Sequence, residues 1–302
     1  MLAGMSEPRR SSNDSSIGGG SRAEAWQLRT RRLVFSRRPL VMGIVNVTPD
    51  SFSDGGQFLS ADRAVEHALG LVEQGADLLD VGGESTRPYA EPVDVDEELR
   101  RVVPVVAEVC RRIDVPVSID TYKAAVARAA LDAGAEIVND VTGMEHDPQM
   151  TGLAAESGAG VCVMHMQGTP RTMQDHPVYD NVVQDVLRYL ARRRDALIDA
   201  GVAQERICLD PGIGFGKTHE HNLALLSHCR RFHELGCPLL VGPSRKGFIG
   251  KVLGDKEKNR TAGTIGVTLA LAAHGVQIVR VHDVGPVREA LLLFEASGGW
   301  ER

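Results

Sequence analysis

The chain has 302 residues, of which 43% are hydrophobic and 25% charged, a composition typical of a globular protein with one large α/β domain or two small ones. A formal net charge of −6 gives no electrostatic case for nucleic acid, and no apolar run approaches the roughly 18 residues of a membrane span. The five cysteines lie in or beside apolar runs, which favours free thiols and a cytoplasmic setting.

Residues 1–30 differ from the rest of the chain, because they are rich in Ser, Gly and Arg and contain few apolar side chains. Such a segment buries too little apolar surface to offset the entropy of ordering, so we expect a disordered tail. It lacks the apolar core of a secretory signal, and its acidic residues Glu7, Asp14 and Glu24 argue against a transit peptide. The folded domain is expected to span residues 38–298.

From residue 40 onward, short apolar runs alternate with segments of helical periodicity. The runs are nearly continuous, as expected of parallel strands covered on both faces. They comprise residues 41–47, 78–83, 115–120, 136–140, 160–166, 207–212, 238–244 and 277–284. Several helical segments end in a glycine that suits a helix C-cap, namely Gly75, Gly134, Gly201, Gly236 and Gly275.

Eight strand–helix units over about 250 residues predict an α/β fold, a single (β/α)8 TIM barrel with a disordered N-terminal tail. The competing architecture is an open doubly wound sheet. Its usual phosphate-binding signature, GxGxxG after the first strand, is absent. The barrel is therefore the favoured fold.

Polar or charged residues stand at the end of all eight predicted strands, where a TIM barrel builds its active site. These are Asn46, Glu84, Asp120, Asn139 with Asp140, His165, Asp210, Ser244 with Arg245 and Lys246, and Arg280 with His282. Although one or two of them suit a helix cap, eight of eight is better explained by a single polar pocket at the mouth.

This expected pocket is mixed in sign. The hydrogen-bond acceptors, which suit an N–H-rich heterocycle, are Asp120, Asn139 and Asp210. The donors, which suit an anion such as phosphate, are Lys246, Arg280 and His282. A ligand with an N–H-rich ring at one end and a phosphate at the other satisfies both sets.

The segment "DPGIGFGKT" (210–218) ends like a phosphate-binding P-loop, but Pro211 stands where GxxxxGK[ST] requires glycine. A GxGxxG motif starting at Gly212 fails because Lys217 occupies its last glycine position. We expect these glycines to allow the backbone to approach a flat ligand closely, with Phe215 available for stacking.

In chain order, eight segments between about residues 40 and 295 resemble the dihydropteroate synthase family of pterin-binding barrels. They are "NVTPDSFSDGG", "GADLLDVGGESTRP", "SIDT", "IVND", "MHMQGTPRTMQ", "LDPGIGFGKT", "SRKGFIG" and "VRVHDV". The resemblance implies a transferase of folate biosynthesis that joins 4-aminobenzoate to 6-hydroxymethyl-7,8-dihydropterin pyrophosphate with Mg2+, releasing pyrophosphate. It also implies a homodimer inhibited by sulfonamides and acting on small molecules, without nucleic acid or membrane partners.

The resemblance also implies residue roles. For the pterin ring these are hydrogen bonds from Asp120, Asn139, Asp210 and Lys246, a slot lined by Met164, Phe215 and Gly242, and stacking by Arg280. For pyrophosphate they are Arg280, His282 and, through Mg2+, Asn46. Around aminobenzoate they are Asp50, Phe52, Asp54, Thr86, Arg87 and Pro88, with Phe215 and Lys246. Catalysis is expected from Lys246, Asp210, Arg280, His282, Asp50 and Asp54.

Two details sharpen this expectation. The stretch "TPDSFSDGG" (48–56) is expected to be a lid that orders with ligand. Gly247 replaces a larger residue found in many relatives, which implies a more open aminobenzoate rim.

Two alternatives remain open from the residues alone. One is a pterin-binding methyltransferase that serves a corrinoid partner, which has no use for "SRK" and the first loop. The other is a non-catalytic pterin-binding paralogue, which is expected to have lost Arg87, Lys246 or His282.

Overall fold

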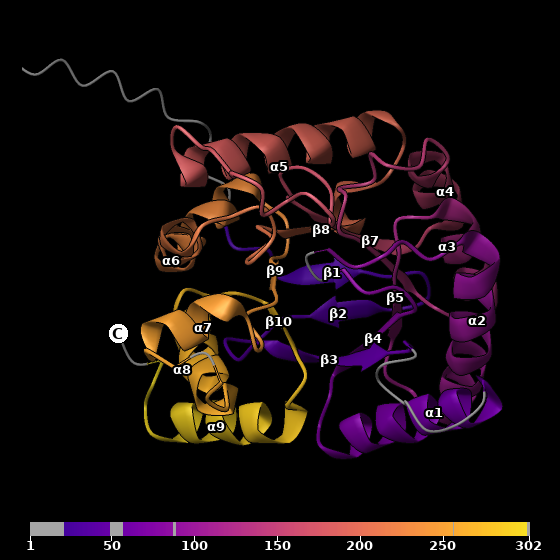
Figure 1. Cartoon of the computed structure of the whole chain (residues 1–302), viewed down its shortest axis with the longest axis horizontal. Coiled ribbons are helices and arrows are strands. Elements are labelled where there is room, and N and C mark those ends of the chain that lie inside the picture. Colours follow the sequence, from indigo (N-terminus) through magenta and orange to yellow (C-terminus); the bar gives the residue numbers. More distant parts are fainter. Residues whose placement is uncertain (1–20, 49–56, 87–88, 256, 301–302) are drawn as a thin grey trace, which may run out of the picture.

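The computed structural model describes residues 21–48, 57–86, 89–255 and 257–300, with the backbone alone for residues 57–60. Eight parallel strands form the centre of the molecule, and helices surround them (Figure 1). The strands are β3 (Leu40–Asn46), β4 (Leu78–Gly82), β5 (Val117–Asp120), β6 (Ile137–Asp140), β7 (Gly160–Met164), β8 (Ile207–Asp210), β9 (Leu240–Val241) and β10 (Ile278–Val281).

The sheet closes on itself. Its hydrogen-bonded order is β8-β7-β6-β5-β4-β3-β10-β9. A parallel bridge between Leu209 and Leu239 joins the two outer members, and the Leu209 amide donates to the Pro238 carbonyl at 2.9 Å. Each predicted strand is present: β3 keeps its predicted length but starts one residue earlier, and the other seven are shortened by up to a few residues at their ends. The predicted (β/α)8 barrel is confirmed.

The helices cover the outside of the barrel (Figure 1). They are α1 (Gln57–Glu73), α2 (Val95–Arg112), α3 (Ala124–Asp132), α4 (Met150–Ser157), α5 (Val182–Asp199), α6 (His219–Ser227), α7 (Gly247–Val252), α8 (Thr261–Ala273) and α9 (Val284–Ala296). The five glycines predicted to end helical segments all have positive φ, as a left-handed cap requires. Among the described residues, no helix combines the length and apolarity needed to cross a membrane.

Alternation along the strands sorts side chains between the barrel interior and the helix layer. The lower interior layer is mostly apolar, with Met42, Leu78, Ile137, Cys162, Cys208, Leu240 and Ile278, and the buried Ser118 of β5 is its one polar member among the described strands. Two residues further along each of these strands lies the next interior position. That upper layer consists of Ile44, Asp80, Asn139, Met164, Asp210, Gly242 and Arg280. The barrel interior therefore changes from apolar to polar within one pleat.

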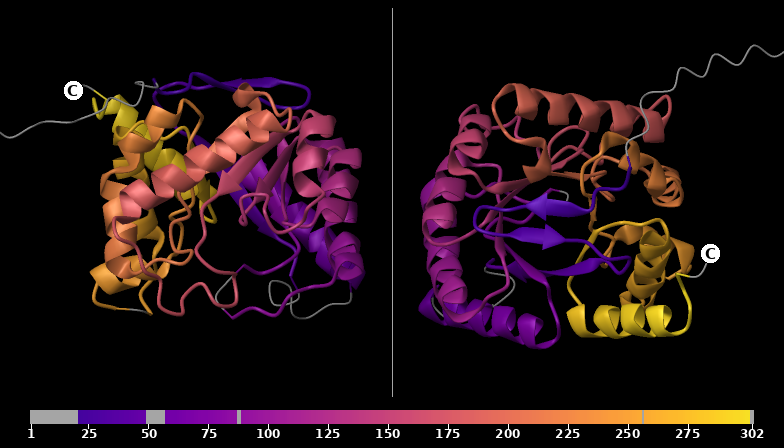
Figure 2. Two further views of the ribbon diagram at one scale, coloured as in Figure 1. Left: turned by 90° about the horizontal axis from the view of Figure 1, so that it is seen from above. Right: turned by 180° about the vertical axis from the view of Figure 1, so that it is seen from behind.

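An antiparallel hairpin of β1 (Ala25–Gln27) and β2 (Arg32–Val34) lies across one end of the barrel (Figure 2). Trp26 is fully buried there, and its indole Nε1 donates to the carbonyl of Arg206 just before β8 at 2.8 Å. At the start of β7, a Cβ on Gly160 would lie 2.6 Å from the Leu28 side chain. The hairpin thus closes the amino-terminal ends of the strands.

This hairpin corrects the expected boundary of the disordered tail. The expectation is wrong for residues 25–30, because Trp26 and Leu28 fill the base of the barrel. Average composition over thirty residues hides two apolar side chains that have a specific cavity to occupy. Residues 1–20 lie outside the described residues.

Trp26→Ala should lower the free energy of unfolding by about 3–5 kcal/mol, since it empties a fully buried site. Urea denaturation followed by circular dichroism measures the change. Val34→Ala in the same hairpin is the control, because Val34 is 71% exposed and its truncation should cost less than about 0.5 kcal/mol. Equal losses for both variants would contradict the sealing role of Trp26.

Candidate active site

The upper interior layer brings most of the predicted site residues together. Asn139, Asp210 and Arg280 face one another across the barrel at the same depth, with Met164 and Gly242 between them. A Cβ on Gly242 would lie 3.8 Å from the Arg280 Cβ, which places this glycine directly beside the base of the Arg280 side chain. Asn46, Asp120 and His282 stand further toward the mouth. Asn46 pairs in register with Gly82, and a Cβ on Gly82 would lie 3.4 Å from the Asp120 Cβ.

Arg280 is held by two carboxylates. Its Nε donates to Asp80 Oδ2 at 2.5 Å and its Nη2 donates to Asp120 Oδ2 at 2.7 Å. Asn139 Nδ2 donates to the same Asp80 oxygen at 3.0 Å. Burial opposes the guanidinium charge, but Asp80 and Asp120 outweigh it and raise the pKa of Arg280. The cation is therefore fixed and permanently charged before any ligand arrives.

Sequence reasoning missed Asp80. The predicted polar end of β4 is the Gly82–Glu84 stretch, whereas the inward polar group is this aspartate in mid-strand, with no exposed surface. A signal was present, because a charged residue inside the buried run "LLDVGG" needs a charged partner.

Asp210, the second carboxylate of the layer, lies at the end of β8, and Lys246 lies beyond the end of β9 at the start of α7. Asp210 Oδ1 accepts a hydrogen bond from the Gly212 amide at 2.7 Å. Burial raises the pKa of Asp210 to about 6, although this hydrogen bond and the charge of Lys246 both act to lower it. Burial, together with the charge of Arg280, lowers the pKa of Lys246 to about 8. The Lys246 Nζ lies 4.1 Å from the centroid of the Phe215 ring, a cation–π contact.

The loop after β8 approaches its neighbours as closely as glycine permits. Gly212, Gly214 and Gly216 all have positive φ. A Cβ on Gly212 would lie 2.0 Å from the His165 carbonyl oxygen, and one on Gly214 would lie 2.9 Å from the Lys246 Cδ. The close approach seen here is to other parts of the protein, and the predicted approach of this backbone to a flat ligand stays a prediction.

Lys217 fastens this loop and was not predicted to have a role. It is 3% exposed, and its Nζ lies 2.9 Å from His165 Nδ1 and 2.8 Å from the Phe215 carbonyl oxygen. Burial lowers the pKa of Lys217 to about 7. Burial and the nearby charge of Lys217 together lower the pKa of His165 to about 2. His165 therefore anchors the loop, which corrects its expected place among the groups facing a ligand.

Two further strand-end residues also face away from the mouth. Asp140 alternates outward from Asn139, and its Oδ1 accepts both the amide and the hydroxyl of Thr142. Glu84 lies beyond the end of β4, where its carboxylate binds Lys123 and accepts the Tyr122 hydroxyl at 2.5 Å. The prediction that all eight strand ends share one pocket is therefore wrong at these positions.

His282 is the second predicted anion-binding group near the mouth. Its Nδ1 lies 3.0 Å from Ser244 Oγ, and its backbone amide donates to the same oxygen. This pairing leaves Nε2 as the free ring nitrogen. Burial, reinforced by the charges of Arg245 and Arg280, lowers the pKa of His282 to about 4, so the ring is neutral at physiological pH. Because Ser244 Oγ already accepts the His282 backbone amide, its hydroxyl hydrogen is available to Nδ1, an arrangement that leaves the ring proton on Nε2.

The described residues of this mouth do not form a cage for a metal ion. Among the described residues, no group of three or more His, Cys, Asp or Glu side chains is arranged to hold a metal ion. Asn46 offers a single amide oxygen. That donor set fits Mg2+ bound mainly to the oxygens of a diphosphate substrate, with one protein ligand, since Mg2+ keeps several non-protein ligands.

The predicted aminobenzoate residues are only partly described. Thr86 is half-buried on the loop after β4. Asp50, Phe52, Asp54, Arg87 and Pro88 lie outside the described residues, and so does most of the expected lid. Gly247 is exposed, and a Cβ there would meet nothing within 4 Å.

Comparison with known proteins gives the same family. The family of pterin binding enzymes matches residues 42–282. The dihydropteroate synthase of Escherichia coli K12 is 47% identical over 259 residues, which cover 86% of this chain and 92% of the relative.

Two solved structures share the architecture and carry informative ligands. One is the Xanthomonas albilineans dihydropteroate synthase with 4-aminobenzoic acid, at 45% identity and a TM-score of 0.85, covering 91% of this chain and 98% of that one. The other is the Burkholderia cenocepacia enzyme with 7,8-dihydropteroate, at 44% identity and a TM-score of 0.82, covering 92% and 97%. The chain belongs to the pterin-binding enzyme family, among the dihydropteroate synthases.

Proposed function

We propose that this chain condenses 4-aminobenzoate with 6-hydroxymethyl-7,8-dihydropterin pyrophosphate to give 7,8-dihydropteroate and pyrophosphate. The observation that carries the proposal is the upper interior layer, where Asn139, Asp210 and Arg280 meet beside Lys246. The ligands of the two solved relatives, 4-aminobenzoate and dihydropteroate, are a substrate and the product of this reaction. The named relatives are dihydropteroate synthases, which favours this reaction over methyl transfer to a corrinoid partner.

The acceptors suit the donor-rich edge of the pterin ring. Asp210 uses Oδ1 for the Gly212 amide and keeps Oδ2 for the ligand. Asn139 gives its Nδ2 to Asp80 and keeps its Oδ1. A carboxylate oxygen and an amide oxygen at one depth of the barrel accept N–H groups from one side of a flat heterocycle.

The anion end lies closer to the mouth. Arg280 is fixed in place and His282 offers Nε2–H. Among the described residues, Asn46 would supply an amide oxygen to a metal ion bound to the diphosphate. When bound, Mg2+ neutralises negative charge on the pyrophosphate. Fixed positive groups aimed at the leaving oxygen stabilise the charge that develops as the C–O bond breaks.

The reaction exchanges one bond for another. The C–O bond between the pterin methylene and pyrophosphate breaks, and the arylamine nitrogen bonds to that carbon and then loses a proton. The pterin stabilises positive charge on the methylene, and Asp210 supports it electrostatically. The arylamine is already neutral, so no strong general base is needed.

The Phe215 ring and Lys246 form the wall nearest the aminobenzoate. The ammonium lies over the ring face, so a second aromatic ring and its carboxylate are both accommodated beside this pair. Open space around Gly247 leaves the rim wide at this point. The loop residues Asp50, Phe52, Arg87 and Pro88 complete the pocket in this proposal.

The cysteines support a reducing, cytoplasmic setting. All five are free, and all but the half-buried Cys110 are buried. Burial raises the pKa of Cys229 and Cys237 to about 12, which keeps these thiols protonated and unreactive.

The first test is turnover. With both substrates and Mg2+, the purified protein should release pyrophosphate only when 4-aminobenzoate is present. Lys246→Ala should lower the rate by at least about a hundredfold, because it removes a charged group preorganised at the mouth. Lys251→Ala on the exposed face of α7 is the control and should keep wild-type activity. Full activity of Lys246→Ala would overturn the assignment.

The second test is pterin binding. Asp210→Asn should weaken the affinity for the pterin pyrophosphate by about 1.5–3 kcal/mol, the cost of losing a charge-assisted hydrogen bond. Isothermal titration calorimetry without 4-aminobenzoate measures this change directly. The exposed Asp195→Asn serves as the control. Identical affinities for both variants would remove Asp210 from the pterin site.

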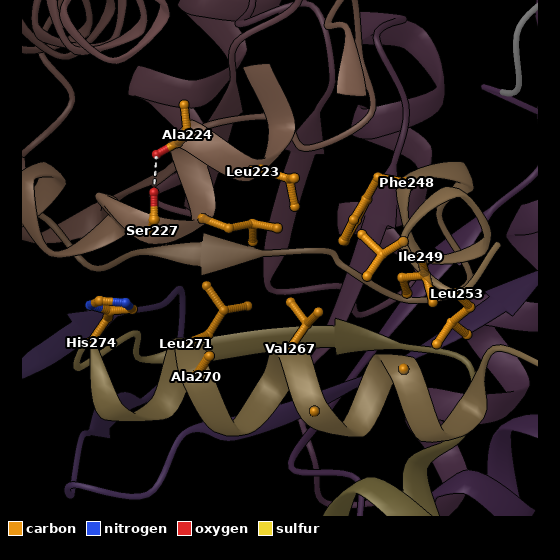
Figure 3. A pocket seen from close by; sticks show the side chains of 14 residues that line it. Leu223, Ala224, Ser227, Phe248, Ile249, Leu253, Val267, Ala270, Leu271 and His274 are labelled. Atoms are coloured by element: carbon orange, nitrogen blue, oxygen red, sulfur yellow. Dashed lines mark hydrogen bonds between the residues drawn. The ribbon is translucent and has the colours of Figure 1, made fainter. Parts of the chain in front are cut away.

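We also propose that the chain forms a homodimer through the face of α6, α7 and α8. These helices enclose an apolar groove of about 640 Å3, with Leu223, Phe248, Ile249 and Val267 on its walls (Figure 3). Val252 is 61% exposed and Leu253 is 42% exposed on the same face. A contiguous apolar patch of this kind marks an interaction surface, and a twofold axis pairs it with itself.

Val252→Asp should convert the dimer to a monomer, because the twofold interface would then bury two unpaired carboxylates, one from each subunit. Light scattering coupled to size exclusion measures the mass. Leu293→Asp is the matched control, since Leu293 is 70% exposed on α9, away from the groove. A monomeric wild-type protein, or dissociation by the control variant alone, would contradict the proposed interface.

A further inference from the structure

Asp80 is the most buried charge in the barrel interior, and no role in substrate contact is assigned to it. Its exposed fraction is zero. One oxygen, Oδ2, accepts both the Arg280 Nε at 2.5 Å and the Asn139 Nδ2 at 3.0 Å. The other, Oδ1, has no hydrogen-bond partner among the described residues.

Stability alone does not account for such a group. Burying an ion pair is costly, and apolar replacements of buried pairs are often neutral or stabilising. A buried oxygen without a partner adds a desolvation cost of about 1–3 kcal/mol. Seven interior positions of the layer below hold apolar side chains, and the eighth, Ser118, holds an uncharged one, so no other described residue shows that this depth of the barrel requires a charge. The charge therefore points to a role in the site above it.

The geometry shows what Asp80 does to its two partners. An asparagine amide has two orientations of similar shape. Donation from Nδ2 to Asp80 selects one of them, in which the Asn139 Oδ1 is left as an acceptor. The same carboxylate oxygen holds the Arg280 guanidinium by its Nε edge, while Asp120 holds Nη2. The plane of the guanidinium is thus fixed by two carboxylates on two different strands.

We propose that Asp80 is a positioning residue that presets the Asn139 amide and the Arg280 guanidinium for the pterin pyrophosphate, without touching the substrate. This inference rests on the proposed function. In that function, Asn139 accepts a hydrogen bond from the pterin ring, and Arg280 contacts both the ring and the pyrophosphate. Asp80 therefore orients the groups that bind both ends of one substrate. The aminobenzoate pocket, built around Phe215 and Lys246, does not depend on it.

The experiment compares Asp80→Ala with Asp77→Ala. Asp77 lies just before the same strand and likewise accepts an arginine, Arg288 Nη1 at 2.8 Å, and one amide, from Val41 at 2.8 Å, but at the far end of the barrel. Each variant loses one ion pair and one further hydrogen bond. Circular dichroism and thermal melting report folding, and calorimetry with the pterin pyrophosphate alone reports binding.

Asp80→Ala should weaken pterin pyrophosphate binding by at least about tenfold, equivalent to about 1.4 kcal/mol. Its KM for 4-aminobenzoate at saturating pterin substrate should stay within about twofold of wild type, whereas a general structural defect would change both substrates. Asp77→Ala should bind the pterin substrate as the wild type does. Wild-type affinity of a folded Asp80→Ala, or equal losses in the two variants, would overturn the inference.

Asp80→Asn provides a second variant in case the alanine variant does not fold. It keeps the shape and an acceptor oxygen but loses the charge, so binding should weaken by about three- to tenfold, and unchanged binding would also overturn the inference. The binding assay separates this inference from the proposed function. If the wild type binds the pterin substrate but releases no pyrophosphate with 4-aminobenzoate, the condensation is wrong while the role of Asp80 is still measured.

Discussion

Strand alternation inside a closed parallel barrel is the constraint on which the rest of the molecule depends. Closure leaves each strand with one inward row of side chains, so position along the strand becomes depth in the barrel. One layer is built from Met42, Leu78, Ile137 and their equivalents, and two residues further the layer contains Asp80, Asn139, Asp210 and Arg280. The apolar layer supports the polar one, and the hairpin carrying Trp26 supports the apolar layer from below.

The polar layer stays organised because its charges are paired within the barrel. Arg280 lies between Asp80 and Asp120, which come from different strands, and Asn139 joins them from a third. Each group restrains the next, so the site has little freedom to rearrange when a ligand binds. A preorganised site of this kind stabilises developing charge without first having to reorient its dipoles.

The sequence predicted the barrel and much of the site, and the reasons are specific. Buried parallel strands read as continuous apolar runs, and their polar ends identified Asp120, Asn139, Asp210, Lys246, Arg280 and His282. Strand ends alone do not give side-chain direction, so Glu84, Asp140 and His165 were placed with them in error. Applying the two-residue period to "LLDVGG" would have indicated Asp80.

Other features depend on contacts between distant segments. Trp26 donates a hydrogen bond to the carbonyl of Arg206, and Lys217 contacts the ring of His165. Neither pair can be predicted from the sequence pattern around its members. Composition gives the average tendency of a segment to fold. Whether a single aromatic ring such as that of Trp26 is ordered depends on the cavity that it fills. Local periodicity therefore predicts elements well and predicts such long-range closures poorly.

The glycine-rich loop after β8 also limits how this site can diversify. A side chain at Gly212 would overlap the His165 carbonyl, and one at Gly214 would displace Lys246. A substitution at either glycine would therefore disturb the loop itself. Gly247, in contrast, lies in open space at the rim. Side chains of many sizes can be accommodated there, so sequence variation around the mouth of the barrel is better tolerated at the rim than in the loop.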